Sequence, residues 1–525
     1  MSNKVVVAGV SIILVVGVAI GVVTTINHSR DAKGKLSPEM KVATSICSPT
    51  HYPDACHKTF ASMNSTDPKE FVKKVIYAAE EEVKKFLNFS DSKIAEAKDN
   101  GLTKMALNDF KDMMQYAIDS LKATYADVDG SDLHNIDDRI NDFRTWLSAV
   151  ISYQQSCLDG FEHDSSWRET MEEAIVASSE QAANALTIVT KLIEILTKLG
   201  SELASPNTRR LFSVEETNYP SWFSTTDRKL IAKIDNSNLK PNAVAGIYDE
   251  YITVDKQYTN ILMFGDGPRR TIVAGRKGVK DGGGITTWQT ATFSAIGSGF
   301  IAKSMGFQNN AGPEKHQAVA LRIQSDKSAF FNCRMDGYQD TLYNHANRQF
   351  SRNCVISGTV DFIFGDSPTV IQNSLLIVRR PMEGQSNMVT AQGKTRIDEN
   401  TGTVIQNCRI VPEQKLFIDR FKFPTYLGRP WKPYSTTIIM ESTLGDFIRR
   451  EGWMPFATQN HEDTLYYAEY NNRGPGANLD ARVNWKGYHK IDKATAMKFT
   501  VEAFLHSKEN WLPLTGVPFT AGLRY

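Results

Sequence analysis

The stretch FFNCRMDGYQDTLY at residues 330–343 returns 21 positions later as SRNCVISGTVDFIF at residues 351–364. Both copies hold Asn-Cys, a glycine, an aspartate and an aromatic residue at matching positions, and QNSL at 372–375 and QNCR at 406–409 repeat the start. From about residue 245, short β-rich runs alternate with turn residues. The repeat predicts a right-handed parallel β-helix with one coil per copy. The alternative, chance similarity within a β-sandwich, is disfavoured by several matches at one offset.

The repeat also places two carboxylates together. Equivalent positions on successive coils stack about 4.8 Å apart, so Asp340 and Asp361 should lie side by side. Two close carboxylates do not both ionise easily, which yields a protonated acid beside an ionised nucleophile or base. Gln317 and Gln339 are also about one coil apart and are placed to donate to a developing oxyanion. The competing interpretation is a pair of surface turns, the commoner place for paired aspartates.

The chain ahead of this region has a different period. Between residues 40 and 200, glycine and proline are scarce and apolar residues recur at helical spacing, as in Val72, Val75, Ile76, Ala79 and Val83. We expect an all-α domain here, an antiparallel bundle of about four main helices. With 525 residues, the chain is long enough for such a bundle and a separate β domain.

The N-terminus indicates the compartment. Residues 5–26 carry no charge and as a helix would span about 33 Å, enough for a hydrocarbon core of about 30 Å. Residues 1–30 are therefore a signal peptide or a signal anchor, and the rest of the chain meets the secretory lumen. Six cysteines and the sequons at Asn64 and Asn88 agree with secretion. Membrane contact is expected only through this segment.

A polar, breaker-rich linker is expected at 201–230. It contains two dibasic pairs, Arg209-Arg210 and Arg228-Lys229. Each is either a solvated basic turn or a site for a processing protease.

Composition and charge exclude some functions. The formal net charge of +1 gives no reason to expect a nucleic-acid partner. No group of His and Cys has the spacing of metal ligands, so no metal or other cofactor is expected.

Ordered motifs between residues 245 and 519 closely resemble plant pectin methylesterases. The two most specific are GYQDTLY at 337–343 and GTVDFIFG at 358–365. Four more follow the family's order: KHQAVALR at 315–322, NMVTAQG at 387–393, YLGRPWK at 426–432 and RVNWKG at 482–487. The family's right-handed parallel β-helix agrees with the repeat.

The resemblance implies roles at the site. Asp361 would attack the C6 carbonyl of a methylated galacturonate in homogalacturonan (pectin), and Asp340 would be the acid and then the base. Gln339, helped by Gln317, would stabilise the oxyanion, and Arg429 would hold Asp361 ionised. Residues expected to bind the saccharide are Thr287, Gln317, Tyr343, Phe364, Arg429 and Trp431. Tyr343 and Phe364 are equally plausible as core fillers.

Residues 40–200 resemble the family's inhibitor-like pro-region. The matching segments are ICSPT at 46–50, YPDAC at 52–56 and WLSAV at 146–150. The resemblance implies a Cys47–Cys56 disulfide and a bundle that restrains the enzyme until cleavage at a dibasic site. The expected product is a secreted cell-wall enzyme, anchored to a membrane before processing if residues 1–30 are not removed. A separate inhibitor protein is a further expected partner.

Three departures from the family pattern stand out. Phe110 replaces a bundle cysteine, which leaves Cys157 without its expected partner, and Ser374 replaces the usual partner of Cys354. Because Cys333 lies one coil from Cys354, we predict a substitute Cys333–Cys354 disulfide. Within the β domain, expected at 231–525, more than a full coil is missing near 244–245, which should expose coil interior and an unpaired strand edge.

Two other functions remain open at this point. A glycosidase on the same fold would use its two carboxylates against an acetal, and a lyase would need Ca²⁺ ligands and a basic residue. Alternatively, the truncated β-helix is catalytically impaired and the helical domain binds and inhibits a separate esterase.

Overall fold

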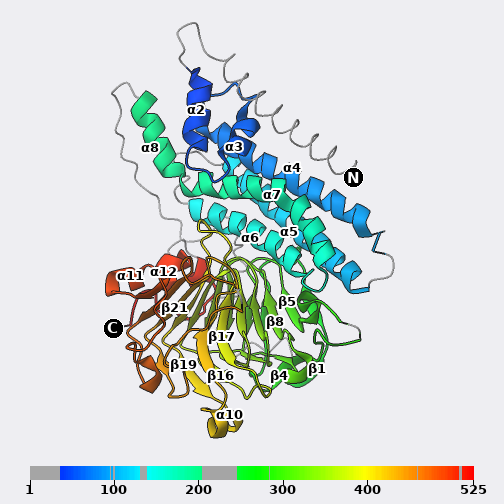
Figure 1. Cartoon of the computed structure of the whole chain (residues 1–525), viewed down its shortest axis with the longest axis vertical. Coiled ribbons are helices and arrows are strands. Elements are labelled where there is room, and N and C mark those ends of the chain that lie inside the picture. The colour runs from blue at the N-terminus through cyan, green and yellow to red at the C-terminus, as the bar shows by residue number, and fades with distance from the viewer. Residues whose placement is uncertain are drawn as a thin grey trace, which may run out of the picture.

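The computed structural model describes residues 36–94, 96–97, 101–130, 139–203, 245–282, 284–457, 459–507 and 511–524. The N-terminal segment and both dibasic pairs lie outside these ranges. Within them, no helix combines the length and apolar character needed to cross a bilayer. A helical bundle lies across one side of a β-helix, with α5 and α6 nearest to it (Figure 1).

Within the described ranges, the bundle has four long helices and three short ones. Each long helix packs on two others, as the antiparallel arrangement predicts. The core includes an edge-on contact between Phe86 and Phe110, so the phenylalanine at the missing-cysteine position fills space in place of a crosslink. The helices are α2 (Pro38–Cys47), α3 (Pro53–Phe60), α4 (Pro68–Ile94), α5 (Gly101–Gly130), α6 (Ile140–Asp159), α7 (Ser165–Thr190) and α8 (Leu192–Leu203).

The predicted parallel β-helix is confirmed. From β1 to β21, each coil adds one strand to each of three parallel sheets, so neighbours within a sheet are one coil apart in sequence. Sheet one contains β1 (Gly246–Asp249), β4 (Thr271–Gly275), β7 (Gly306–Asn309), β10 (Arg334–Asp336), β13 (Val355–Gly358), β16 (Leu375–Val378), β19 (Arg409–Pro412) and β22 (Thr443–Leu444). Sheet two contains β2 (Ile252–Val254), β5 (Phe293–Ala295), β8 (Leu321–Ile323), β11 (Leu342–Asn344), β14 (Ile363–Gly365), β17 (Asn387–Gln392) and β20 (Thr425–Gly428).

Sheet three completes the coils, and short helices follow it. Its strands are β3 (Leu262–Phe264), β6 (Ile301–Lys303), β9 (Ser328–Phe331), β12 (Gln349–Arg352), β15 (Pro368–Gln372), β18 (Gly402–Gln406), β21 (Thr436–Met440), β23 (Tyr466–Tyr470) and β24 (Tyr488–Lys490). The α-helices of the described part of this domain are α10 (Gln414–Asp419), α11 (Lys493–Met497), α12 (Val501–Phe504) and α13 (Trp511–Leu514).

The repeated Asn-Cys dipeptide turns the chain from sheet three into sheet one. Asn332, Asn353, Asn373 and Asn407 all have φ of 52–53°, a left-handed conformation that asparagine tolerates better than most residues. The next residue then points into the coil interior, where Cys333, Cys354 and Cys408 are buried. The repeat in the sequence is thus the corner of each coil.

The disulfide prediction is right in the bundle and wrong in the β-helix. Cys47 and Cys56 are bonded, with Cα atoms 5.6 Å apart. Cys333 and Cys354 are free thiols, although their strands are in register. Register brings the two cysteines close together, but it does not by itself give the Cβ–S–S–Cβ dihedral angle of about 90° that a disulfide needs. Each thiol instead donates to carbonyl groups, Cys333 to Ala302 and Cys354 to Arg352.

The strands β1, β2 and β3 are the outermost described strands of their sheets. The inward residues of this coil, such as Ile252, Val254 and Met263, are only partly buried, whereas Phe330 and Ile363 in later coils are fully buried. The described part of the β-helix therefore begins with a coil whose apolar interior is partly open. The missing coil near 244–245 remains a prediction, because residues 204–244 are outside the described ranges.

Candidate active site

The two aspartates lie on adjacent coils at the start of neighbouring strands. Asp340 precedes β11 and Asp361 precedes β14, and these strands pair in register, Leu342 with Ile363. Both aspartates take the left-handed conformation, with φ of 61° and 51°. Both are buried, with 8% and 7% of their surface exposed. Two equivalent, strained turns therefore present both carboxyl groups to the same region of the molecule.

The surroundings of the two carboxyl groups differ. Arg429 donates from Nε to Asp361 Oδ1 at 2.9 Å and from Nη2 to Asp361 Oδ2 at 2.6 Å. Burial raises the pKa of Asp361, and the Arg429 guanidinium opposes that rise. Burial, and then the charge of Asp361, raise the pKa of Asp340 well above its ordinary value. The arrangement favours an ionised Asp361 beside a protonated Asp340.

The two glutamines lie on adjacent coils beside the aspartates. Gln317 and Gln339 form a parallel β-bridge, and both line the cavity that contains Asp340 and Asp361. Two amide groups are therefore available at one side of the carboxyl pair, the arrangement needed to stabilise an oxyanion.

Aromatic rings form one wall of this cavity. Tyr343 and Phe364 are stacked, with ring centroids 4.3 Å apart and an interplanar angle of 13°. Trp431 lies 6.0 Å from Phe364, and Thr287 at the start of a short 3-10 helix faces the same space. The structure therefore brings all the predicted catalytic and substrate-binding residues around one cavity of about 360 Å³.

The helical bundle forms the other wall, which the sequence did not predict residue by residue. Ser156 of α6 lies 3.1 Å from the Tyr343 hydroxyl and 2.8 Å from His345 Nε2. Asp159, at the end of α6, accepts a 2.5 Å hydrogen bond from Lys432 Nζ beside Trp431. Glu162 also lines the cavity, and its pKa is raised by burial and by Asp159. The bundle thus covers the cavity with polar and acidic groups.

One face of α6 makes most of these contacts. Ser152 donates to the Asp366 carboxylate at 2.6 Å, and Thr145 accepts from Asn400 Nδ2 at 3.0 Å. Ser148 of the same helix accepts from the Asn400 backbone N–H. Together with Asp142, Ser156 and Asp159, these residues recur every three or four positions, the spacing of one helix face. This row of polar residues at helical spacing was the available signal in the sequence.

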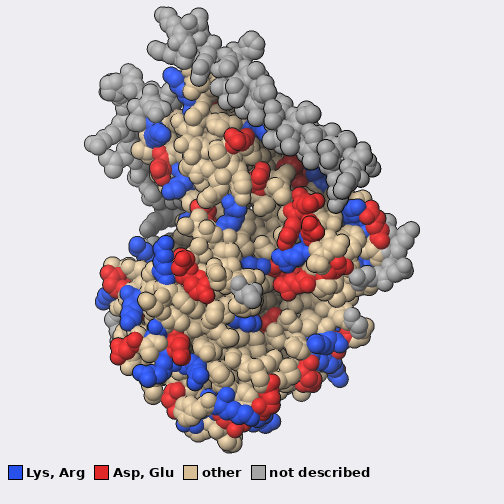
Figure 2. Space-filling view, viewed as in Figure 1, with Lys and Arg blue, Asp and Glu red and all other residues tan. Residues whose placement is uncertain are grey.

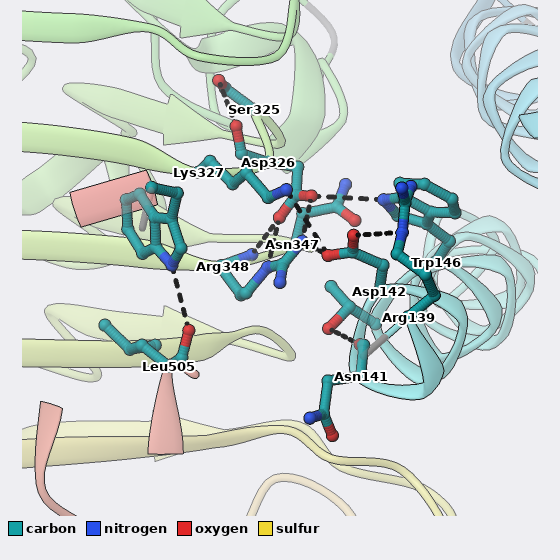
Figure 3. Close-up of polar contacts among 12 residues, drawn as sticks. Arg139, Asn141, Asp142, Trp146, Ser325, Asp326, Lys327, Asn347, Arg348 and Leu505 are labelled. Carbon is teal, nitrogen blue, oxygen red and sulfur yellow. Dashed lines mark hydrogen bonds and ion pairs between the residues drawn. The ribbon is translucent and has the colours of Figure 1, made fainter. Parts of the chain in front are cut away.

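A buried ion-pair network anchors the start of α6 (Figure 3). Arg348 has no exposed side-chain surface and pairs with Asp326 of the β-helix and Asp142 of α6. Trp146 Nε1 donates to Asp326 Oδ2 at 3.2 Å. Burial would raise the pKa of Asp142, but the Arg348 and Lys327 charges hold it below its ordinary value. Asp142 is therefore ionised and pairs with a cation that the β-helix contributes.

Helix α5 contributes a second buried carboxylate. Asp109 accepts hydrogen bonds from Thr286 and Gln289 of the β-helix. Burial raises the pKa of Asp109 to about 6, against those hydrogen bonds and the nearby Arg322. Arg322 is itself buried over the ring of Trp288, 3.3 Å from its centroid. Each helix facing the cavity therefore places an aspartate against the β-helix.

Two family models match the chain. The model described as Pectinesterase matches residues 227–508, and the one described as Plant invertase/pectin methylesterase inhibitor matches residues 41–192. The probable pectinesterase/pectinesterase inhibitor 21 of Arabidopsis thaliana is 38% identical over 97% of this chain and 80% of its own length.

Two further comparisons agree. Pectinesterase 4 of Arabidopsis thaliana is 38% identical and aligns over the whole of both chains, across 596 positions. This chain has 525 residues, so that relative carries residues with no counterpart here. The solved structure of a pectin methylesterase from carrot is 46% identical, covers 56% of this chain and 93% of its own, and superposes with a TM-score of 0.52. The chain belongs to the pectinesterase family and carries an inhibitor-type helical domain ahead of the enzyme domain.

Proposed function

We propose that this chain is a pectin methylesterase that hydrolyses the methyl esters of homogalacturonan to methanol and a free carboxylate. The observation that carries the proposal is the pair Asp340 and Asp361, equivalent turns of adjacent coils in one cavity, with Arg429 bonded to Asp361 alone. Family membership supports the same activity. A glycosidase would use the two carboxyl groups against an acetal, but the amides beside them suit an acyl oxyanion better.

Asp361 acts as the nucleophile. Its carboxylate oxygen attacks the C6 carbonyl carbon, and Gln339 and Gln317 donate hydrogen bonds to the oxyanion that forms. The tetrahedral intermediate collapses to an acyl-enzyme anhydride, and protonated Asp340 gives its proton to the departing methanol. Ionised Asp340 then takes a proton from water as the hydroxide attacks the anhydride. This step releases the galacturonic acid group, which loses its remaining proton to solvent, and restores both aspartates.

The remaining cavity residues bind the polysaccharide. Trp431 and the Tyr343–Phe364 pair offer apolar ring faces to sugar C–H groups, and Thr287 offers a hydroxyl to the same cavity. Arg429 keeps Asp361 ionised and oriented. In the described structure Tyr343 and Phe364 are each only 5% exposed, so contact with a polymer requires the bundle to move away.

The bundle, residues 40–200 in this proposal, therefore acts as an inhibitor within the chain. It covers the cavity through α5 and α6 and places Asp159 and Glu162 where a uronate chain would run. Cleavage at Arg209-Arg210 or Arg228-Lys229, in the linker 201–230, allows it to leave the β domain. Residues 1–30 direct the chain to the secretory route, and the processed enzyme works in the cell wall.

The test is methanol release from highly methylated pectin. The full chain is compared with the chain cut by a protease within 201–230, and each is also prepared as Asp361→Ala and as the matched control Asp480→Ala, an exposed aspartate. We expect activity in the cut wild type and the cut control, and a loss of at least about 10⁴-fold in Asp361→Ala.

Two outcomes would contradict the proposal. Equal activity in wild type and Asp361→Ala would exclude Asp361 as the nucleophile. A cut chain with no activity that still inhibits a second pectin methylesterase would favour the impaired variant, in which the helical domain is the functional part. The first described coil, whose apolar interior is partly open, is the observation that favours this second function.

A further inference from the structure

A second cavity lies apart from the active site, where α6 meets the C-terminal coils. Its volume is about 430 Å³, within the range of small-ligand sites. The walls come from α6, from the Lys394–Thr401 loop that joins β17 to β18, and from α12 and the residues around it. Figure 2 shows Lys and Arg side chains, with acidic neighbours, on the face where α11 and α12 approach the bundle.

Cations outnumber carboxyl groups in the lining of this cavity, which contains Arg144, Lys394 and Lys498 but only one acidic residue, Glu399. Arg144 of α6 has a buried Nε with no hydrogen-bond partner. Neither Arg144 nor Lys394 forms an ion pair within the described ranges. Burial lowers the pKa of both groups, against the charge of Asp398 beside Arg144 and the charges of Glu399, Asp366 and Asp398 beside Lys394. These carboxyl groups therefore offset only part of the cost of burying the two cations. The cavity therefore favours an anion.

The neighbouring titratable groups oppose an anion only weakly. Glu399 is 2% exposed and its Oε2 has no hydrogen-bond partner. Burial, and then the charge of Asp366, raise the pKa of Glu399 well above its ordinary value, which weakens the opposition of this carboxyl group to an anion. Burial lowers the pKa of His506 to about 4, so His506 is neutral in mildly acidic solution and offers a ring nitrogen for hydrogen bonding.

Aromatic rings complete the lining. Tyr466 stacks on Phe499 with centroids 5.6 Å apart and an interplanar angle of 28°, and Phe504 lies 6.0 Å from Phe499. Tyr434 lines the same space. Cations, neutral donors and ring faces in one cavity suit a ligand with a carboxylate, hydroxyl groups and an apolar face.

We propose that this cavity binds an acidic sugar, a galacturonate unit of de-esterified pectin, and that this ligand holds the bundle on the β-helix. A ligand in this cavity contacts both domains, because Arg144 belongs to the bundle whereas Lys394, Glu399 and His506 belong to the β-helix. A ligand that needs both parts stabilises their association. The choice of galacturonate as the ligand rests on the proposed function, because galacturonate is the product of that reaction. The proposal that the cavity binds an anion does not depend on the proposed function.

The test is calorimetric titration of the uncut chain with trigalacturonate. Maltotriose, which has no carboxylate, and inorganic phosphate, which has no ring, are the ligand controls. We expect one saturable site for trigalacturonate, no binding of maltotriose, and phosphate binding at least tenfold weaker. Lys394→Met and Arg144→Gln should each weaken trigalacturonate binding at least tenfold, whereas Lys415→Met, an exposed lysine on α10, should not.

The Trp431→Ala variant separates this site from the active-site cavity. Binding that survives in Trp431→Ala and is lost in Lys394→Met supports the proposal, and the reverse pattern overturns it. Equal binding of phosphate and trigalacturonate overturns the assignment of an acidic sugar. In the chain cut within 201–230, trigalacturonate should slow release of the bundle in wild type but not in Arg144→Gln. Methanol release tests the proposed function separately, so the two ideas fail independently.

Discussion

At the residue scale, Asp340 and Asp361 occupy equivalent turns but differ in one partner. Arg429 bonds only to Asp361, and the charge of Asp361 in turn raises the pKa of Asp340. One guanidinium is thus enough to divide two identical side chains into a nucleophile and an acid.

Replacing that guanidinium should change the pH profile as well as the rate. In Arg429→Gln the pKa of Asp361 rises further, because burial is no longer opposed by a positive charge. Asp361 must be ionised to attack, so the acidic limb of the kcat/KM profile of the cut chain should move to higher pH. We expect kcat to fall about 10²–10³-fold, as for loss of one charged hydrogen-bonding partner. Arg420→Gln, which breaks an exposed pair with Asp446, is the control. An unmoved acidic limb would contradict this role.

The free cysteines give a second prediction at this scale. Cys157, Cys333, Cys354 and Cys408 are buried thiols, so a thiol reagent should label none of them in the native chain. After unfolding without a reductant, four thiols per chain should react, and six after reduction. Only two reactive thiols in the unreduced, unfolded chain would mean that two of these four cysteines are bridged, which would contradict the four free thiols of the structure.

At the scale of elements, α6 connects the bundle to the β-helix. Its row of polar residues runs from Asp142 near the start to Asp159 at the end, and every member bonds to a residue of the β-helix. An amphipathic helix normally turns such residues to solvent. Here they face a second domain whose own polar groups complete their hydrogen bonds.

Of the contacts along that row, the Asp142–Arg348 ion pair should contribute most to the docking of the bundle on the β-helix. Breaking a buried ion pair costs up to about 3–5 kcal/mol, and Asp326 remains to moderate the loss. We expect Asp142→Asn to weaken docking enough to raise methanol release by the uncut chain at least tenfold. Asp129→Asn, which breaks an exposed pair with Lys73 inside the bundle, should leave that activity unchanged. If both variants behave alike, the network in Figure 3 does not hold the bundle in place.

At the scale of the whole molecule, docking itself should respond to pH. Docked Asp109 has a pKa of about 6, and once released it returns to about 3.9. Between these two pKa values the docked form binds more protons than the released form. The contribution of Asp109 to the stability of docking is therefore complete below about pH 4 and is lost as the pH rises through 6. Glu162 and Asp112 shift in the same direction. His345, whose pKa is lowered by burial and by Arg322, acts in the opposite direction.

A comparison of variants isolates the contribution of Asp109. In the chain cut within 201–230, the dissociation constant of the bundle is measured from pH 4 to pH 7 for wild type and Asp109→Asn. Asparagine mimics the protonated carboxyl group and does not titrate. We expect the ratio of wild-type to variant dissociation constants to rise with pH by up to about 100-fold, the equivalent of two pKa units. A ratio that stays constant over this range would show that Asp109 does not titrate on release.

The sequence by itself determined the coil and the chemistry within it. A 21-residue repeat fixes which residues stack, so Asp340, Asp361, Gln317 and Gln339 could be placed together before any coordinates were known. The family motifs added Arg429, Thr287 and Trp431, and the helical period gave the bundle. All of these rest on local periodicity or on short contiguous segments.

Only the tertiary structure decided what lies against the site. The contacts of Asp109, Asp142 and Asp159 join residues far apart along the chain, and no local pattern encodes which surface meets which. The same reason explains the wrong disulfide, because separation along the coil predicted closeness but not the direction in which the two thiols point. Direction and docking are settled by packing in three dimensions, where side chains from separate domains satisfy each other's charges and hydrogen bonds.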